Sequence, residues 1–297
     1  MVAYLTASRS IKRSSETDRY RLHALRRSFA GNIMQEVTPT KISAYVNECR
    51  AAGVSDSTIN RELALLSAAI TYVNRDLDWR LPNPIAKRWL PEPEGRVRWI
   101  TKQEADALIA AARAARRAPF LADLITVALH TGCRRGELLR LEWSRVDLRN
   151  HLIYLEARHT KAKKRRALPM GSSTRGALLR QARFRAEHCP RSPWVFVYRD
   201  GHPAEDIRGA FNKACADAGI EDFTFHDLRH TCAAWLVQAG IPLATIRDLL
   251  GHSTVLMTER YAHLAPDNLR MVVHALDESH SSHTEPEAHQ NDALQHL

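Results

Sequence analysis

The sequence predicts a mainly α-helical protein with a small antiparallel β-sheet in its second half, which is an α+β arrangement. Apolar residues recur at helical spacing through residues 19–80 and again from about residue 204. Between these regions, two β-rich segments, HLIYLEA and RRALPM, flank a short basic turn and predict a hairpin. No apolar run approaches the roughly 18 residues that a membrane helix needs. We therefore expect a cytoplasmic protein that makes no contact with a membrane.

The first helical region contains ISAYVNECRAAG and STINRELALLSAAITYVNRD. Gly53 is expected to end one helix there, and Ser57 or Thr58 to open the next. The segment LPNPIAKRWLPEPEG has four prolines and a glycine, which favour extended chain over helix and predict an interdomain linker. We expect a helical domain with its linker at residues 1–93, a second domain at 94–277, and a polar, disordered tail at 278–297.

The second domain is expected to begin at a capping box, because Thr101 and Glu104 stand three residues apart before an apolar run. Gly132 then stops a buried helix, PFLADLITVALHTG, and RRGELLRLEW begins another. The hairpin follows, with Lys161 near its tip. The remaining predicted helices are AEDIRGAFNKACADAG, FHDLRHTCAAWL, PLATIRDLL and TERYAHL.

The stretch FHDLRHTCAAWL places His226, Arg229 and His230 at positions i, i+3 and i+4, on one face of a helix. The opposite face is expected to be buried through Leu228, Ala233 and Leu236. Histidines at i and i+4 are also the metal ligands of H-E-x-x-H sites, but Asp227 replaces the glutamate and no third ligand is evident. We therefore expect no metal and no cofactor.

Charge indicates the kind of partner. The formal net charge is +10, from 43 Lys and Arg against 33 Asp and Glu, and residues 277–297 contain five of the acids without any Lys or Arg. The body of the chain is thus more basic than the total, which favours a polyanionic partner. A merely solvated basic surface explains the charge equally well. The five cysteines are scattered without a C-x-x-C pair, so neither a disulfide framework nor a zinc ribbon is expected.

Taken singly, each remaining candidate has an ordinary structural explanation. Arg134 precedes Glu137 by three residues and would form a surface ion pair. Lys161 belongs to the basic run KAKKRR, and such a run is usually solvated. His252 follows a glycine at a helix end, where a histidine commonly interacts with the helix dipole. Tyr261 in an amphipathic helix is more often a core aromatic than a nucleophile.

The order of these elements is more informative than any one of them. TGCRRGELLRL, TKAKKRRALP, HDLRH and LLGH, followed by a tyrosine nine residues after the last histidine, resemble the motif set of the tyrosine recombinase (phage integrase) family. The resemblance extends from about Thr101 to Leu276. More weakly, residues 20–89 resemble the helical core-binding domain of the same family.

The resemblance implies catalytic roles for six residues, two of them histidines; the other four are the nucleophile, two arginines and a lysine. Tyr261 would attack the scissile phosphate while Arg134 and Arg229 clamp its nonbridging oxygens. Lys161 would protonate the leaving 5′ oxygen. These residue types suit the chemistry, because planar guanidinium groups meet phosphate oxygens bidentately. A 5′ alkoxide is also basic enough to need a general acid.

The two histidines and two supporting residues complete the implied site. His226 and His252 would hydrogen-bond the phosphate or assist proton transfer, while Glu137 and His230 would support the site, His230 structurally. A tyrosine has an ordinary pKa near 10, so attack at neutral pH needs a base and a cationic field. We expect His226 and the two arginines to supply both, and the arginines and histidines together to replace a metal.

The resemblance therefore implies a site-specific DNA recombinase or integrase that cleaves and rejoins strands through a 3′-phosphotyrosyl intermediate, without metal or ATP. Its partner would be double-stranded DNA, bound by a homotetramer on paired sites, with the free protein a monomer or weak oligomer. Accessory DNA-bending or directionality proteins and a bacterial nucleoid location would fit this activity. Only about 19 residues precede the helical region, so the arm-binding domain of many phage-type integrases is either absent or missing from the sequence. A catalytically silent DNA-binding protein and a type IB topoisomerase remain alternatives.

Overall fold

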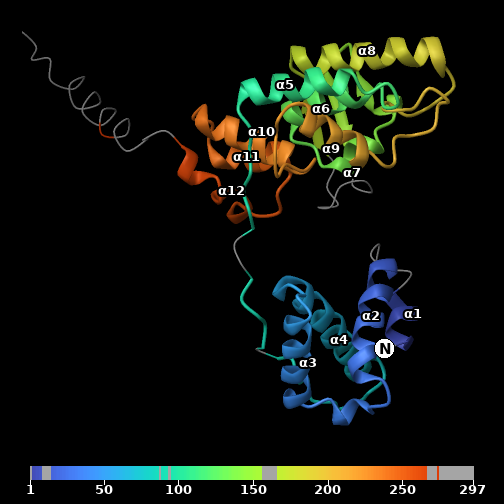
Figure 1. Cartoon of the computed structure of the whole chain (residues 1–297), viewed down its shortest axis with the longest axis vertical. Coiled ribbons are helices and arrows are strands. Elements are labelled where there is room, and N and C mark those ends of the chain that lie inside the picture. Colours follow the sequence, from blue (N-terminus) through green and yellow to red (C-terminus); the bar gives the residue numbers. More distant parts are fainter. Residues whose placement is uncertain are drawn as a thin grey trace, which may run out of the picture. The chain divides into compact units, whose positions relative to one another are not determined.

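In the computed structural model of the chain, the described residues are 2–8, 15–86, 88–92, 95–155, 166–265 and 273. Their internal contacts divide the chain into two units, Met1–Gly95 and Arg96–Leu297 (Figure 1). Across the described ranges the fold is mainly helical, with a three-stranded antiparallel sheet in the second unit. This is the fold class that the sequence predicts. In the same ranges, no helix has both the length and the apolar character needed to cross a bilayer.

Helix α4 (Asp56–Asp76) is the centre of the first unit. It contacts α1 (Val2–Ser8), α2 (Ser15–Phe29) and α3 (Pro39–Ala51), and the short 3-10 helix η1 (Met34–Glu36) precedes α3. Ile59 and Leu63 of α4 are fully buried in the core of this unit. Ser55 caps α4 by accepting a hydrogen bond from the Thr58 N–H. The expectation that Ser57 or Thr58 opens this helix is therefore wrong, because both lie within its first turn.

Two asparagines of α4 hold the proline-rich segment, which is non-helical in its described residues as predicted. Asn60 accepts a hydrogen bond from the Leu90 N–H and donates one to the Leu90 carbonyl, both at 2.9 Å. Asn74 bonds to the N–H and carbonyl of Leu81 in the same way, at 2.9 and 2.8 Å. A side-chain amide offers the same kinds of donor and acceptor as a backbone amide. It can therefore form the backbone hydrogen bonds of an extended segment that has no neighbouring strand.

Helix α6 (Leu121–Thr131) is enclosed by other helices of the second unit. It contacts α5 (Lys102–Arg113), α8 (Ser172–His188) and α10 (Asp227–Gln238) (Figure 1). Every residue of α6 except His130 is buried, as expected of a helix that is apolar on all sides. Helix α5 opens with the predicted capping box of Thr101 and Glu104. Helix α9 (Arg208–Asp217) begins four residues later than its predicted start at Ala204.

The predicted hairpin is present as β2 (Leu152–Leu155) and β3 (Arg166–Pro169). A third strand, β1 (Val146–Asp147), pairs with β2 and follows the 3-10 helix η2 (Trp143–Arg145). Ile153 pairs with Leu168, and Leu155 pairs with Arg166. Because Ile153, Leu155 and Leu168 are buried, the alternation of the strands places Arg166 on the inward face as well. The turn between β2 and β3, including Lys161, lies outside the described residues.

Helix α10 is buried on both faces. It begins at Asp227, and His226 precedes it with helical backbone angles, so the predicted face with Arg229 and His230 is continuous. The apolar face is buried at Leu228 as expected. His226 is exposed, but Arg229 and His230 are only 3% and 8% exposed. Packing therefore encloses two of the three polar side chains within the domain.

Tyr261 does not lie within a helix. Helix α12 (Leu256–Glu259) ends before it, and the 3-10 helix η3 (Ala262–Leu264) begins after it, so the predicted continuous helix through TERYAHL is wrong. The physical reason is a series of tight hydrogen bonds between residues three apart, from Thr258 N–H to Val255, Tyr261 N–H to Thr258 and Leu264 N–H to Tyr261. Tyr261 thus lies between the two short helices α12 and η3, which follow α11 (Leu243–Leu250) in the chain.

Candidate active site

Two left-handed glycines bring the ends of α6 and α11 together. Gly132 ends α6 with a φ of 60° and Gly251 ends α11 with a φ of 65°, a region of backbone conformation that favours glycine. At Gly132 a Cβ would also overlap the Leu250 side chain. The chain continues from Gly132 through one residue to Arg134, and from Gly251 directly to His252. These two candidate residues are therefore placed by helix ends that touch.

Arg134 precedes α7 (Arg135–Leu139) and is fixed by three hydrogen bonds. Its Nη1 donates to Glu137 Oε1 at 3.0 Å, and its backbone N–H donates to the other carboxylate oxygen at 2.9 Å. Its Nη2 donates to the Gly251 carbonyl at 3.1 Å. The ion pair that the spacing predicts is present, but Glu137 is only 2% exposed, so the pair is not a surface one. A buried carboxylate thus orients the Arg134 guanidinium group.

Arg229 reaches the same place from α10. Its Nη1 donates to the Gly132 carbonyl at 2.6 Å, while its Nη2 is buried and has no hydrogen-bond partner in the described part of the chain. Burial, and then the charges of Arg134 and Arg166, lower the pKa of Arg229 to about 10, so it remains cationic at neutral pH. A buried cationic donor without an acceptor is unfavourable. The arrangement would be stabilised by an anion.

Arg166 at the start of β3 joins this cluster. Its Nη2 donates to Glu137 Oε2 at 2.9 Å, and its Nη1 donates to the Leu250 carbonyl. Gly251 leaves the necessary space, since a Cβ there would overlap the Arg166 guanidinium group. The side chain is 13% exposed, so the interpretation of KAKKRR as a solvated run is wrong for this residue. Strand alternation is the sequence feature that could have identified Arg166, because it shares the inward face with Leu168.

The histidines of the site are neutral at neutral pH. Burial, and then the charge of Arg229, lower the pKa of His252 to about 3. Burial, and then the neighbouring His226, lower the pKa of His230 to about 4. Desolvation, followed by the charge of Arg229, also lowers the pKa of His226. His252 is oriented by a 2.8 Å hydrogen bond between its Nδ1 and the Thr258 hydroxyl.

The Tyr261 hydroxyl forms a hydrogen bond with Nδ1 of His230. Tyr261 is 1% exposed, and burial raises its pKa to about 12 although Arg260 and Arg229 act in the opposite direction. When neutral His230 carries its proton on Nε2, its Nδ1 accepts this bond from the phenol. Sequence reasoning gave His230 a structural part and missed this contact, since the two residues lie 31 positions apart and no spacing rule joins them.

The structure thus gathers most of the predicted residues into one cluster. Its members are Arg134, Glu137, Arg229, His230, His252 and Tyr261, together with Arg166. His226 is exposed and lies at the edge of the cluster, and the centroid of its ring is 5.0 Å from that of the His230 ring. Lys161 lies outside the described residues. Within the described ranges, no group of three or more His, Cys, Asp or Glu side chains is placed to hold a metal ion. The cluster can hold an anion beside a phenol hydroxyl.

Comparison with known proteins gives matches over both units. The phage integrase family model matches residues 98–268, and the model of the phage integrase N-terminal domain matches residues 3–88. The integrase of Salmonella phage P22 is 28% identical, over 87% of this chain and 74% of that protein. The integrase of Escherichia phage 186 is 29% identical, over 77% of this chain and 63% of that protein. The tyrosine recombinase XerC of Corynebacterium glutamicum is 27% identical, over 73% of this chain and 71% of that protein.

Two solved structures share the fold. The Tn1549 transposon integrase in complex with transposon right end DNA has a TM-score of 0.77 and 21% identity, over 93% of this chain and 98% of that chain. A lambda integrase dimer bound to a COC′ core site has a TM-score of 0.73 and 21% identity, over 87% of this chain and 92% of that chain. Because the phage integrase model matches more than half of the residues, the chain belongs to the phage integrase family of tyrosine site-specific recombinases.

Proposed function

We propose that the cluster around Arg134 and Arg229 is the active site at which this recombinase cleaves and rejoins double-stranded DNA. The observation that supports this most directly is the buried Nη2 of Arg229, a cationic donor without an acceptor in the described part of the chain. A phosphodiester supplies an acceptor of the right charge and geometry. Tyr261 lies within the electrostatic range of the same arginine, as the influence of Arg229 on its pKa indicates.

In the proposed reaction, Tyr261 Oη forms a bond to phosphorus, and the bond from phosphorus to the 5′ oxygen breaks. Arg134 and Arg229 stabilise the charge that develops on the nonbridging oxygens. Lys161 gives a proton to the 5′ oxygen, which leaves as a hydroxyl. The product is a 3′-phosphotyrosyl ester, similar in energy to the diester it replaces. Attack by the 5′ hydroxyl of another strand reverses the step without ATP.

His230 is the proposed acceptor of the phenolic proton. In the DNA-free protein a phenol with a pKa of about 12 keeps its proton against an imidazole with a pKa of about 4. A phosphodiester bound between Arg134 and Arg229 would add negative charge nearby and raise the pKa of His230. Substrate binding would therefore favour the transfer. The hydrogen bond to Tyr261 supports His230 rather than His226 as this base.

We further propose that both units bind DNA, with a helical core-binding domain at residues 1–93, a catalytic domain at 94–277 and a polar tail beyond it. The net charge of +10 and the match of residues 3–88 to the N-terminal domain model support this division. A lambda integrase of the same fold, with a TM-score of 0.71, has been solved as a tetramer bound to a Holliday junction. By that likeness we propose a homotetramer on paired sites, acting in the bacterial cytoplasm.

Covalent capture tests this proposal. The full chain is incubated with a library of duplexes of random sequence and denatured, and the DNA that remains attached to protein is recovered and sequenced. The recovered sequences identify the preferred duplex and its scissile position. Tyr261→Phe should abolish the adduct while binding the recovered duplex almost as well as wild type, because only the nucleophilic oxygen is lost.

Tyr198→Phe is the matched control. It removes another phenol hydroxyl from the same unit, one that donates to the Asp206 carbonyl at 3.1 Å, and adduct formation should be unchanged. An adduct that persists in Tyr261→Phe would assign the nucleophile to another residue. Wild-type protein that binds DNA without any adduct would support the catalytically silent alternative. Relaxation of plasmid without pairing of sites would support a topoisomerase.

A further inference from the structure

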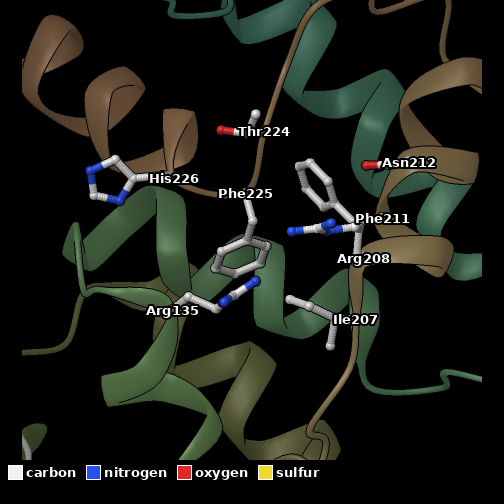
Figure 2. Close-up of a pocket in the computed structure, with 8 residues that line it drawn as sticks. All are labelled: Arg135, Ile207, Arg208, Phe211, Asn212, Thr224, Phe225 and His226. Atoms are coloured by element: carbon white, nitrogen blue, oxygen red, sulfur yellow. The ribbon is translucent and has the colours of Figure 1, made fainter. Parts of the chain in front are cut away.

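A pocket of about 540 Å³ adjoins the active site through His226. Its lining comes from α7, α9 and the segment that leads into α10 (Figure 2). The floor consists of buried side chains, Ile207, Phe211 and Phe225. The rim is polar and exposed, with Arg135, Arg208, Asn212, Thr224 and His226. A volume of this size lies within the usual range of ligand sites.

Arg135 and Arg208 reach this pocket from different elements. Arg135 is the first residue of α7 and Arg208 is the first residue of α9. Figure 2 shows both guanidinium groups directed toward the Phe225 ring. Among the described residues, neither side chain donates a hydrogen bond or forms an ion pair. Other exposed arginines of this unit, such as Arg180, do pair with an aspartate.

Two carboxylates of this neighbourhood are bonded to other groups. Asp206 accepts a hydrogen bond from the Arg208 backbone N–H at 2.9 Å, not from its guanidinium group. Asp227 accepts hydrogen bonds from the Thr224 hydroxyl at 2.9 Å and from the Thr224 N–H at 2.8 Å, and it pairs with Arg96. In the described part of the chain, the guanidinium groups of Arg135 and Arg208 thus converge on the pocket without a carboxylate bonded to either of them. Like charges that converge repel each other, and an anion between them would relieve the repulsion. The guanidinium fork matches phosphate oxygens in particular.

The neighbouring residues indicate what else the ligand contains. Asn212 lies one helical turn after Arg208 and adds an amide to the same rim. The apolar floor at Phe225 suits a sugar rather than a second charged group. Arg134 and Arg135 are consecutive, but their side chains lie in different places, because Arg134 bonds to Glu137 and Gly251 whereas Arg135 lines the pocket. One of the two can hold the scissile phosphate while the other reaches a neighbouring one.

We propose that this pocket binds the DNA backbone immediately beside the scissile phosphate. Arg135 and Arg208 hold the adjacent phosphate, and its deoxyribose lies against Phe225. The inference rests on the proposed function and deepens it. Two phosphate subsites fix which phosphate of the strand lies at Tyr261, whereas a single subsite would let the strand slide. Arg135 and Arg208 are thus positioning residues for strand cleavage.

Methylphosphonate substitution tests this subsite, because it removes the charge of one chosen phosphate. The duplex recovered by covalent capture is prepared with a methylphosphonate on either side of the scissile phosphate. In wild-type protein, one of these two substitutions should lower adduct formation by about 10- to 100-fold, as expected for loss of a charge-assisted contact. The double variant Arg135→Ala, Arg208→Ala should lose a similar factor on natural DNA. It should lose nothing further on the sensitive methylphosphonate duplex.

Salt dependence gives a second measurement. The slope of log binding constant against log salt should become shallower by about one for each arginine removed. Arg175→Ala in α8 is the control, since Arg175 is exposed but lines no part of the pocket, and it should retain the full methylphosphonate effect. Both pocket arginines are exposed, so the double variant should melt within about 2 °C of wild type.

Two results would overturn the inference while leaving the proposed function intact. In the first, each methylphosphonate lowers adduct formation by the double variant as much as by wild type, so the pocket holds no phosphate. In the second, an abasic nucleotide beside the scissile phosphate impairs wild type but not the double variant, so the pocket holds an extruded base instead of the backbone. If wild-type protein forms no adduct with any duplex, the proposed function itself fails.

Discussion

Removing the Arg166 guanidinium group should slow DNA cleavage far more than it weakens DNA binding. In the proposed reaction Arg166 contacts no atom of the scissile phosphate. It donates to Glu137, which orients Arg134, and to the Leu250 carbonyl at the end of the helix that leads into His252. Arg166 is therefore a positioning residue whose loss would displace two groups of the site at once.

The size of the effect follows from these contacts. Arg166→Ala removes two hydrogen bonds that involve a charge, each worth about 1.5–3 kcal/mol. Glu137 keeps its bond to Arg134, so the lower total of about 3 kcal/mol is expected. In a unit of this length, Arg96–Leu297, that loss lowers the melting temperature by roughly 6–12 °C. A displacement of about 1 Å at the phosphate clamp would slow adduct formation by roughly 100-fold.

Arg145→Ala is a matched control for this prediction. Arg145 is also buried, and it donates to Glu142 at 2.6 Å and to the Arg140 carbonyl at 3.2 Å, away from the candidate site. Both variants should lose similar thermal stability, measured by circular dichroism, but only Arg166→Ala should form the adduct slowly at a temperature where both are folded. Arg166→Lys should not restore the rate, because a lysine lacks the rigid fork that bridges two acceptors. Equal adduct rates for the two alanine variants, or full rescue by lysine, would refute the reasoning.

Three further predictions concern protonation and metals. Burial lowers the pKa values of His230 and His252 to about 4 and about 3, so these histidines bind fewer protons in the folded protein than in the unfolded one below pH 6.5. The free energy of unfolding, measured in urea, should therefore fall as the pH decreases from about 6.5 to 4, and it should fall less in His230→Gln. A free energy of unfolding that does not change with pH would contradict this. Lys161→Ala should cleave ordinary DNA roughly 10²- to 10⁴-fold more slowly, and sulfur in place of the bridging 5′ oxygen should restore cleavage, since a thiolate leaves without a proton. Rescue of a neighbouring lysine variant instead would reassign the acid. EDTA should leave adduct formation unchanged, because the arginines stabilise the phosphate charge; activity lost in EDTA and regained with one metal would show a metal requirement.

Local sequence patterns predict the parts of this fold that local forces decide. The capping box at Thr101 and the stop at Gly132 can be predicted from neighbouring residues, and both are present as predicted. The position of Tyr261 depends instead on tight backbone turns between α12 and η3, so the periodicity of TERYAHL predicts a helix that is not formed. The hydrogen bond between His230 and Tyr261 likewise depends on how α10 packs against η3. Contacts of that kind have no signature in the spacing of residues.

The arginines of the site are held mainly by groups that leave their charge available. Arg134 and Arg166 share the carboxylate of Glu137, whereas their other bonds, and the bond of Arg229, go to backbone carbonyls. Those carbonyls belong to the C-terminal ends of α6 and α11, where the helix dipole is negative. A carboxylate for every arginine would fix the side chains equally well but would cancel the charge that a phosphate needs. Helix ends closed by glycine orient the guanidinium groups with partial charges only, so the cluster keeps a positive field for the DNA backbone.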